Sequence, residues 1–430
     1  MGRQVAEALD ALRNLGTPDE MRALARQGYA PRPTPPVNAH IHLPPNFSAF
    51  ESVAQAVNLA AEEGIGALGV SNYYDYEVYG DFVQRARHKG IFPLFGTEII
   101  CMEDALRDAG IKINDPGNPG KLYFCGKGIT RFDEMTPQAT RLIGVIRRND
   151  STRMAQMVDE MERIFTERGL KTGIDEQAVV DMVVRRHGSD RSAVYLQERH
   201  ISQAFQEALF EKVRPEERIE RLSRVLGAKT KASGPEDAVS MQNDIRSHLM
   251  KAGKPAFVEE TFIGFDDARR LILELGGVPC YPTVADGASP ICQFEQSPDR
   301  LIAAIQERNI HAAEWIPVRN TVGVLREYVV KMREAGLAIT AGTEHNTLDL
   351  VPLDPFCTDG KVPDDLRAIF WEGACVVAGH QFLTLHGECG FVDGRGNPNP
   401  DYASADERVK AFAGIGAAVI QRYDEVCGRT

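Results

Sequence analysis

The feature that most constrains the fold of this chain is a regular alternation of short apolar runs with segments of helical periodicity. The runs that predict strands lie at 37–42, 65–70, 91–98, 122–129, 277–281, 311–316 and 337–343. Helices are expected at 81–89, 266–274, 321–334, 363–377 and 406–426, and also after Ser297 and after the capping-box pair Ser48 and Glu51. About seven strand–helix units predict an α/β fold with a parallel sheet, closed as a distorted β/α barrel.

A long helical segment interrupts this alternation. Between residues 149 and 255 the apolar positions recur at helical spacing, as in Met154, Met157, Val158 and Met161. A barrel does not require such a segment, so we expect an inserted helical subdomain that serves as packing or as a lid over the barrel mouth. The expected domains are an arm at 1–36, a barrel at 37–148 and 256–430, and the insertion at 149–255.

The arm itself has two parts. Thr17 and Glu20 have the spacing of a capping box, with Pro18 in the first turn, so a helix is expected from there to Gly28. A proline-rich connector at 31–36 then leads to the first strand. The amphipathic N-terminus lacks the apolar centre of a signal peptide, and we expect a cytoplasmic protein.

Composition excludes several classes of protein. The 430 residues are 43% hydrophobic and 26% charged, as in an ordinary soluble protein with a sizeable core. A net charge of −12 argues against nucleic acid as a partner. No run reaches the roughly 18 apolar residues that span a membrane. The eight cysteines contain no CxxC pair and are expected to be reduced and mostly buried. A small molecule is the expected partner, and the oligomeric state stays open.

Histidines and carboxylates follow the predicted strands. Enzymes built on β/α barrels carry their sites at the carboxyl ends of the strands. His40 and His42 are two residues apart on the first strand and therefore point to the same side. Glu98 follows the third strand, and Glu344 and His345 follow the last. Two imidazoles and two carboxylates suit Zn, Mn or Fe and leave room for water or substrate.

These motifs resemble those of the PHP (polymerase and histidinol phosphatase) superfamily. The resemblance rests on His40-Ile41-His42, Gly96-Thr97-Glu98-Ile99 and Gly342-Thr343-Glu344-His345, and it covers roughly 37–129 and 266–377. It implies a distorted seven-stranded β/α barrel. It also implies metal-dependent phosphoesterase activity, for which better-known members use up to three metals.

The departures from the family pattern imply one metal per chain. The family's Thr-Asp-His becomes Ser71-Asn72-Tyr73, and a common histidine of the fourth strand aligns with Tyr123. Ala-His-Pro becomes Cys280-Tyr281-Pro282, and Asn346 replaces the last histidine. Neutral tyrosine is a poor ligand because its pKa is near 10. The set that survives for one divalent ion is His40, His42, Glu98 and Glu344.

Other side chains near predicted strand ends are candidates for catalysis or substrate binding. Candidate acid/base or hydrogen-bonding groups are Tyr73, Tyr281 and His345. The tyrosines could instead simply pack at the barrel mouth. His345 could be a metal ligand, a base, or a residue with neither role. Candidate contacts to a phosphate, carboxylate or polar substrate are Tyr123, Lys127, Arg131, Arg319 and Asn346, although each cation alone could be a surface charge. Glu314, on a strand, is expected to pair with a buried arginine.

Three functions are compatible with these residues. The first is a PHP-type metal-dependent hydrolase that acts on a small polar substrate, such as a phosphoester, through activated water. The second is a single-metal isomerase, epimerase or lyase that acts on a sugar or sugar acid, which the tyrosines and the lost ligands favour. The third is a non-catalytic barrel that binds a ligand. The number of bound metals distinguishes them.

Overall fold

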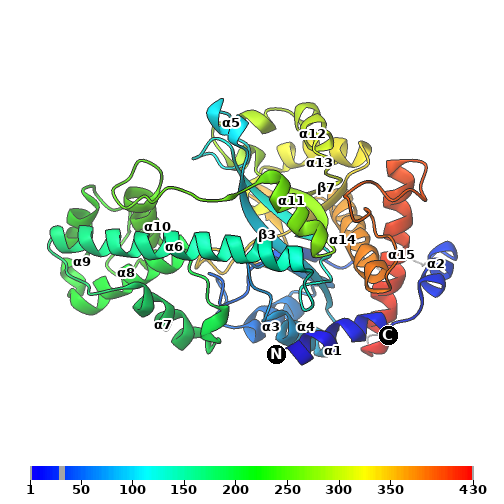
Figure 1. The fold of residues 1–430 in the computed structure, drawn as a ribbon, viewed down its shortest axis with the longest axis horizontal. Helices are drawn as coiled ribbons and strands as arrows, with labels where there is room; N and C mark the ends of the chain where they lie inside the picture. The colour runs from blue at the N-terminus through cyan, green and yellow to red at the C-terminus, as the bar shows by residue number, and fades with distance from the viewer. Residues whose placement is uncertain (1, 29–33, 429–430) are drawn as a thin grey trace.

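The computed structural model describes residues 2–28 and 34–428 and contains a closed barrel surrounded by helices (Figure 1). The barrel strands, in spatial order, are β1 (Val37–Ile41), β2 (Ala67–Val70), β3 (Phe92–Met102), β4 (Lys121–Lys127), β6 (Val278–Thr283), β7 (Ala312–Trp315) and β8 (Ala338–Ala341). The last strand returns to the first, since the Thr343 amide donates to the His40 carbonyl at 3.1 Å and Ile41 bridges Glu344. The predicted distorted β/α barrel is therefore confirmed.

One strand runs against the others. β4 is antiparallel to both of its neighbours, with Gly96 opposite Lys127 on one side and Lys127 opposite Val278 on the other. The expectation of a purely parallel sheet is wrong at this strand. The start of β4, at Lys121, therefore lies at the mouth where the parallel strands end, and its last residue lies at the opposite end of the barrel. A two-residue strand, β5 (Ile263–Gly264), adds to the far end of β3.

Helices cover the outside of the barrel. They are α3 (Val53–Glu62), α4 (Tyr79–His88), α11 (Phe265–Glu274), α12 (Pro298–Glu307), α13 (Val322–Glu334), α14 (Asp364–Leu385) and α15 (Ala405–Val426). Shorter elements are α5 (Asp104–Asp108) and the hairpin of β9 (Phe356–Cys357) and β10 (Gly360–Lys361). The helix expected after Ser48 begins later, because Ser52 caps α3 and the Ser48 hydroxyl instead donates to the His42 carbonyl at 2.7 Å.

Two glycines let α14 lie in close contact with its neighbours. A Cβ at Gly373 would lie 1.9 Å from the carbonyl oxygen of Ile339 in β8. A Cβ at Gly416 in α15 would lie 1.7 Å from the carbonyl oxygen of Cys375 in α14. Any larger residue would force these backbones apart. The helix pair α14–α15 is thereby fixed against the strand that precedes Glu344.

The inserted segment is helical, as predicted, and has its own apolar core. It contains α6 (Pro137–Glu167), α7 (Glu176–His187), α8 (Glu198–Lys212), α9 (Pro215–Leu226) and α10 (Ala238–Ile245), followed by a π-helical turn at Arg246–Met250. Its buried side chains form a cluster separate from the barrel core, in which Phe165 and Phe205 contact each other at 4.7 Å between ring centroids. The helix α6 begins at Pro137, well before the expected boundary at 149, and runs continuously from the barrel into the insertion (Figure 1).

The N-terminal arm packs on the barrel helices. It consists of α1 (Gly2–Arg13) and α2 (Pro18–Arg26), and the predicted capping box of Thr17 and Glu20 is present at α2. Pro31 and Pro33 of the predicted connector lie outside the described residues. All eight cysteines are free, and six are buried, as expected. Within residues 2–28 and 34–428 there is no helix long and apolar enough to cross a membrane.

Candidate metal centre and cavity

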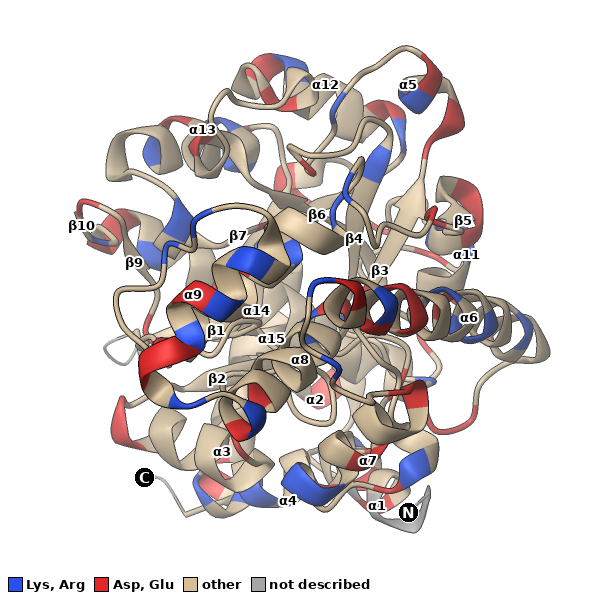
Figure 2. Ribbon diagram, turned by 90° about the vertical axis from the view of Figure 1, so that its left-hand side faces the viewer, with Lys and Arg blue, Asp and Glu red and all other residues tan. Residues whose placement is uncertain are grey.

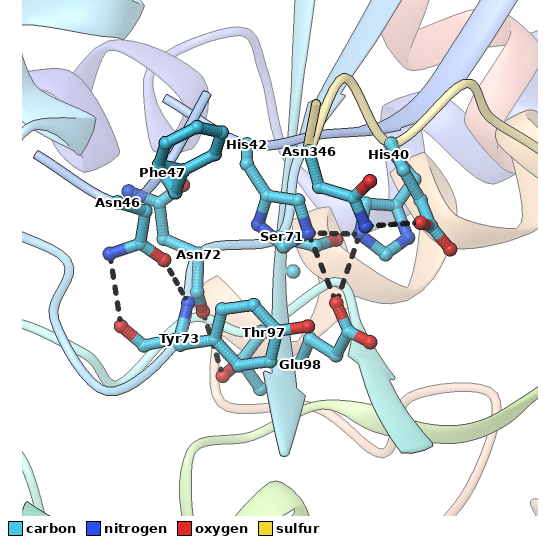
Figure 3. Close-up of polar contacts among 12 residues, drawn as sticks. His40, His42, Asn46, Phe47, Ser71, Asn72, Tyr73, Thr97, Glu98 and Asn346 are labelled. Atoms are coloured by element: carbon cyan, nitrogen blue, oxygen red, sulfur yellow. Dashed lines mark hydrogen bonds and ion pairs between the residues drawn. The ribbon is translucent and has the colours of Figure 1, made fainter. Parts of the chain in front are cut away.

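Three side chains from two strands converge inside the barrel mouth. His40 and His42 come from β1 and the residue after it, and Glu98 comes from β3 (Figure 3). The two imidazole Nε2 atoms are 3.3 Å apart, and Glu98 Oε2 lies 3.1 Å from His42 Nε2 and 3.6 Å from His40 Nε2. Two ligands held about 2.1 Å from one tetrahedral ion lie about 3.4 Å apart. The spacing of the three atoms therefore fits a common divalent cation.

The hydrogen bonding of this cluster is incomplete without a further group. All three side chains are buried, with at most 3% of their surface exposed. Within the described part of the chain, His42 Nδ1 has no hydrogen-bond partner, and the contacts of Glu98 Oε2 with the two imidazoles lack hydrogen-bond geometry. Buried polar atoms are rarely left in this way because the loss of hydration is costly. A cation at the meeting point of the two Nε2 atoms would satisfy the Glu98 oxygen, so the residues fit a metal site.

A charged pair behind the cluster orients His40. Glu314 of β7 accepts a hydrogen bond from His40 Nδ1 at 2.6 Å, and Lys127 Nζ lies 2.5 Å from the other Glu314 oxygen. The Nδ1 proton is thereby held on the side of Glu314, and Nε2 is directed at the cluster. Although burial alone would lower it, the Glu314 carboxylate raises the pKa of His40 to about 9. The expected arginine partner of Glu314 is thus wrong, and its partners are a lysine and a histidine.

Tyr73 lies beside the cluster. Its ring stacks on the ring of His42 at 4.9 Å, with an interplanar angle of 4°. The Tyr73 amide donates to the side chain of Asn46 at 2.6 Å, which fixes the turn that presents the ring. Burial, followed by the charge of Glu98, raises the pKa of Tyr73 well above its ordinary value. Its hydroxyl therefore stays protonated and can act as a hydrogen-bond donor toward a ligand at the mouth.

The side chain of Asn72 fixes the loop that follows β1. Asn72 stands where the resembling family has an aspartate, and its side chain accepts from the Leu43 amide at 2.8 Å and donates to the Leu43 carbonyl at 2.9 Å. Both ends of the amide are used, so the loop after β1 is fixed to the end of β2. The Asn72 carbonyl accepts from the Glu98 amide at 3.4 Å, but its side chain is committed to Leu43 rather than to the three converging ligands.

Glu344 lies at the rim of the same cavity with partners of its own. Arg319 forms two ion-pair contacts with it, one of which measures 2.9 Å, and Asn346 Nδ2 donates to it at 2.6 Å. The clustered atoms are those of His40, His42 and Glu98, and Glu344 is not among them. Glu344 and His345 have left-handed backbones, with φ of 59° and 51°, an uncommon conformation that often marks functional sites. Coordination by Glu344 stays a prediction.

His345 and Tyr281 do not line the cavity. His345 Nδ1 lies 2.7 Å from the Thr343 hydroxyl and Nε2 lies 2.9 Å from the Val351 carbonyl, so both ring nitrogens are occupied. The Tyr281 hydroxyl donates to Glu295 at 2.8 Å. Side chains alternate along β6, and because Cys280 lies near Glu314 inside the barrel, Tyr281 points outward. These contacts do not support the acid/base role predicted for either residue.

The reversal of β4 separates the residues expected near its end. Lys127 is buried beneath Glu314 and also donates to the Ala39 carbonyl at 3.0 Å, so it does not reach the cavity. Arg131 is exposed beside Leu275, at the end of the barrel opposite the mouth. Both were expected at the mouth, and the antiparallel strand places them away from it. Tyr123, near the start of β4, does line the cavity, as do Arg319 and Asn346.

The cavity lies between the barrel mouth and the insertion and has a volume of about 450 Å³. Helices α8 and α9 lie in front of the barrel strands when the molecule is viewed from the insertion side (Figure 2). Two contacts tie the parts together: the Phe47 amide donates to Gln197 at 2.6 Å, and His187 Nδ1 donates to the Glu51 carbonyl at 2.9 Å. The insertion therefore helps to enclose the site.

Sequence reasoning missed the cavity residues that the insertion and the reversed strand contribute. The cations among them are Lys121, Arg153, Arg199, Arg246 and Lys251, and the acids include Asp115, Asp150 and Glu198. The insertion residues belong to amphipathic helices whose polar faces give no sign of pointing at a barrel. Lys121 precedes the predicted strand at 122–129, and only knowledge of the antiparallel direction would have placed it at the mouth.

Comparisons with known proteins support the fold. No protein-family model and no curated protein matches the chain. A candidate metal-dependent phosphoesterase from Bifidobacterium adolescentis is similar in structure, with 13% identity, a TM-score of 0.53, and coverage of 77% of this chain and 94% of that chain. An amidohydrolase from Chromobacterium violaceum, solved with bound sulfate and no metal, has 16% identity, a TM-score of 0.48, and coverage of 77% and 96%. At 13% identity, the likeness to the phosphoesterase concerns the fold alone.

Proposed function

We propose that this protein is a metal-dependent hydrolase, similar to the PHP phosphoesterases, that acts on a small polar substrate with one divalent ion. The observation that carries the proposal is the convergence of His40, His42 and Glu98, in which one buried carboxylate oxygen faces two imidazole Nε2 atoms at 3.1 and 3.6 Å. Three protein ligands around an ion leave coordination positions open, which is the arrangement of catalytic rather than structural metal sites.

The surrounding residues have complementary roles in this proposal. A divalent ion at this site would supply Lewis acidity and lower the pKa of a coordinated water. Glu314 and Lys127 keep the His40 ring in its binding orientation. Tyr73 donates a hydrogen bond to the substrate beside His42, and Arg319, at the rim, binds an anionic oxygen of the substrate after exchange with Glu344. Zn, Mn and Fe all suit this set of donors.

A single ion is favoured over several. A second group of potential ligands, His40, Cys125 and Glu314, shares one histidine with the first. Lys127 Nζ already lies 2.5 Å from Glu314 and contributes the positive charge that a second ion would bring. Burial also raises the pKa of the Cys125 thiol, so that group stays neutral. A paired-metal clamp on a phosphoryl group is therefore not part of this proposal.

An isomerase, epimerase or lyase acting on a sugar or sugar acid is the second candidate. One ion can polarise a carbonyl without a second metal, and the protonated Tyr73 hydroxyl beside it could stabilise an enediolate oxygen. The stacking of Tyr73 on His42 favours this alternative, because it places a proton donor where the resembling phosphoesterases have a further histidine.

Metal content and turnover test the proposal together. We expect about one Zn, Mn or Fe per chain by elemental analysis, turnover of p-nitrophenyl phosphate with that metal, and loss of both in His40→Ala. The matched control is His88→Ala, since His88 is exposed on α4 and contacts the Gln84 carbonyl. One tightly held metal without phosphatase turnover would favour the isomerase or lyase. No metal at all would refute both enzymatic functions.

A further inference from the structure

One cation of the cavity differs from all the others. Within the described residues, six lysines and arginines line the cavity, and five of them form ion pairs: Lys121, Arg153, Arg246, Lys251 and Arg319. Arg199, in the first turn of α8, has neither a hydrogen bond nor an ion pair from its guanidinium to any described residue. Its contact is with the ring of Phe47, at 5.9 Å from the centroid, which is the outer limit of a cation–π interaction.

The carboxylate next to Arg199 in the sequence is already occupied by other side chains. Glu198, adjacent to Arg199 in the sequence, lies 2.8 Å from Lys251, 3.0 Å from Arg153 and 3.4 Å from Arg246. Arg153 also lies 3.7 Å from Glu260, and Asp150 of the insertion lines the same cavity, so the carboxylates on this side are shared among Arg153, Arg246 and Lys251. Among the described residues that line the cavity, Arg199 is left without a carboxylate at ion-pair distance.

Arg199 stays charged at the wall of the cavity. Burial, followed by the charges of Arg246 and other neighbours, lowers the pKa of Arg199 to about 10, so the side chain remains charged at neutral pH. The side chain is half-buried and lines the cavity, so its N–H donors are available to a ligand there. Its five N–H donors match the planar oxygens of a carboxylate or the oxygens of a phosphate.

We propose that Arg199 binds an oxyanionic group of the substrate, a phosphate or a carboxylate, so that the insertion recognises one end of the molecule while the metal centre acts on the other. This inference rests on the proposed function for the identity of the reacting end. The anion site itself depends only on the cavity and on the unpaired guanidinium. The substrate class is therefore a small molecule with an anionic group separate from the bond that reacts.

Metal-free protein allows the proposed anion site at Arg199 to be tested without the metal centre. Inorganic phosphate and, separately, acetate are titrated calorimetrically into chelator-treated protein at constant ionic strength, so that no ion can hold the anion. We expect binding of at least one of them and a rise in its Kd of about tenfold or more in Arg199→Ala, since the variant loses charge-assisted hydrogen bonds to the anion. Phosphate alone would indicate a phosphorylated substrate, and acetate alone would indicate a carboxylate.

Two further variants keep the result interpretable. Arg224→Ala removes an exposed arginine of the same insertion, paired with Glu220 on α9, and should leave the Kd unchanged. Arg199→Lys keeps the charge and should retain part of the affinity, which a purely structural role through folding would not predict. Binding of neither anion, or equal Kd values for wild type and Arg199→Ala, would overturn the inference. Failure of His40→Ala to lose metal would refute the hydrolase without affecting this result.

Discussion

The barrel interior contains two regions of buried charge that differ in how completely they are paired. At the bottom, Lys127, Glu314 and His40 form a chain of contacts of 2.5 and 2.6 Å in which each charge has a partner. At the mouth, Glu98 Oε2 is opposed by two imidazoles at 3.1 and 3.6 Å, and the Arg199 guanidinium, which faces the mouth from α8, has no ion pair among the described residues. Buried charge is costly unless it is compensated. We therefore assign the lower region a structural and orienting role and propose that the upper region binds ligands.

The largest effect is expected from breaking the lower region. Lys127→Met leaves Glu314 buried with only His40 as a charged partner, so the free energy of unfolding should fall by about 3–5 kcal/mol, as measured by urea denaturation. The matched control is Lys410→Met, because Lys410 pairs with Asp406 at the surface at 2.7 Å. That change should cost about 1 kcal/mol or less.

A double variant tests the reason for this loss. Lys127→Met combined with Glu314→Gln removes both charges and should recover part of the lost stability, because no unpaired carboxylate remains. If Lys127→Met alone unfolds no more easily than Lys410→Met, the lower region is not the stabilising pair that we describe.

The next largest effect concerns metal binding at the mouth. His42→Ala removes one of three converging ligands, and the affinity for the ion should fall by more than about 100-fold. Such a loss exceeds the usual effect of changing a residue that only orients a ligand. Elemental analysis after dialysis against a competing chelator measures this loss, with His88→Ala as the control. Metal content that is equal in the two variants would place the ion elsewhere.

A smaller loss of metal affinity is expected when Glu314, which belongs to the lower region, is changed, because Glu314 orients the metal ligand His40. Glu314→Gln removes the charged acceptor that orients His40 but none of the converging ligands, so the metal affinity of the folded protein should fall by about 10–100-fold. The same change leaves the Lys127 ammonium without its carboxylate, so the variant should also be less stable than the wild type. Chelator competition measures the affinity, and circular dichroism monitors the fold. An affinity equal to that of the wild type would mean that the ring is positioned by packing alone.

The smallest effect is expected at Glu344. Its carboxylate is occupied by Arg319 and Asn346, so Glu344→Gln should weaken metal binding by less than about tenfold. The same chelator competition measures it, beside His42→Ala. A loss as large as that of His42→Ala would instead make Glu344 a fourth ligand that exchanges Arg319 for the ion.

Prediction from the sequence succeeded where the signal was local. The strand–helix alternation gave the barrel, the helical stripe around Met157 and Met161 gave the insertion, and the spacing of His40 and His42 predicted a shared direction that the structure confirms. These features depend on periodicity within a few residues, which the chain carries regardless of its final packing.

Prediction failed where the result depends on strand direction or on distant packing. Lys127 and Arg131 were expected at the mouth because they lie near the end of a predicted strand, but β4 is antiparallel, and the positions that reach the mouth are Lys121 and Tyr123 instead. Tyr281 and His345 have the right positions in the sequence, yet Glu295 and Val351 hold their polar atoms outside the cavity. No local pattern encodes which distant atom will complete a hydrogen bond.

The sequence by itself determined which side chains are available and on which side of each strand they lie, because backbone geometry sets those directions over two to four residues. The tertiary structure alone decided that Glu314 and Lys127 lie behind His40 and that Arg199 faces the same cavity from 159 residues further along the chain. The physical reason is that pairing of buried charge is a property of the folded packing, in which each ion takes the partner that the whole chain brings within reach.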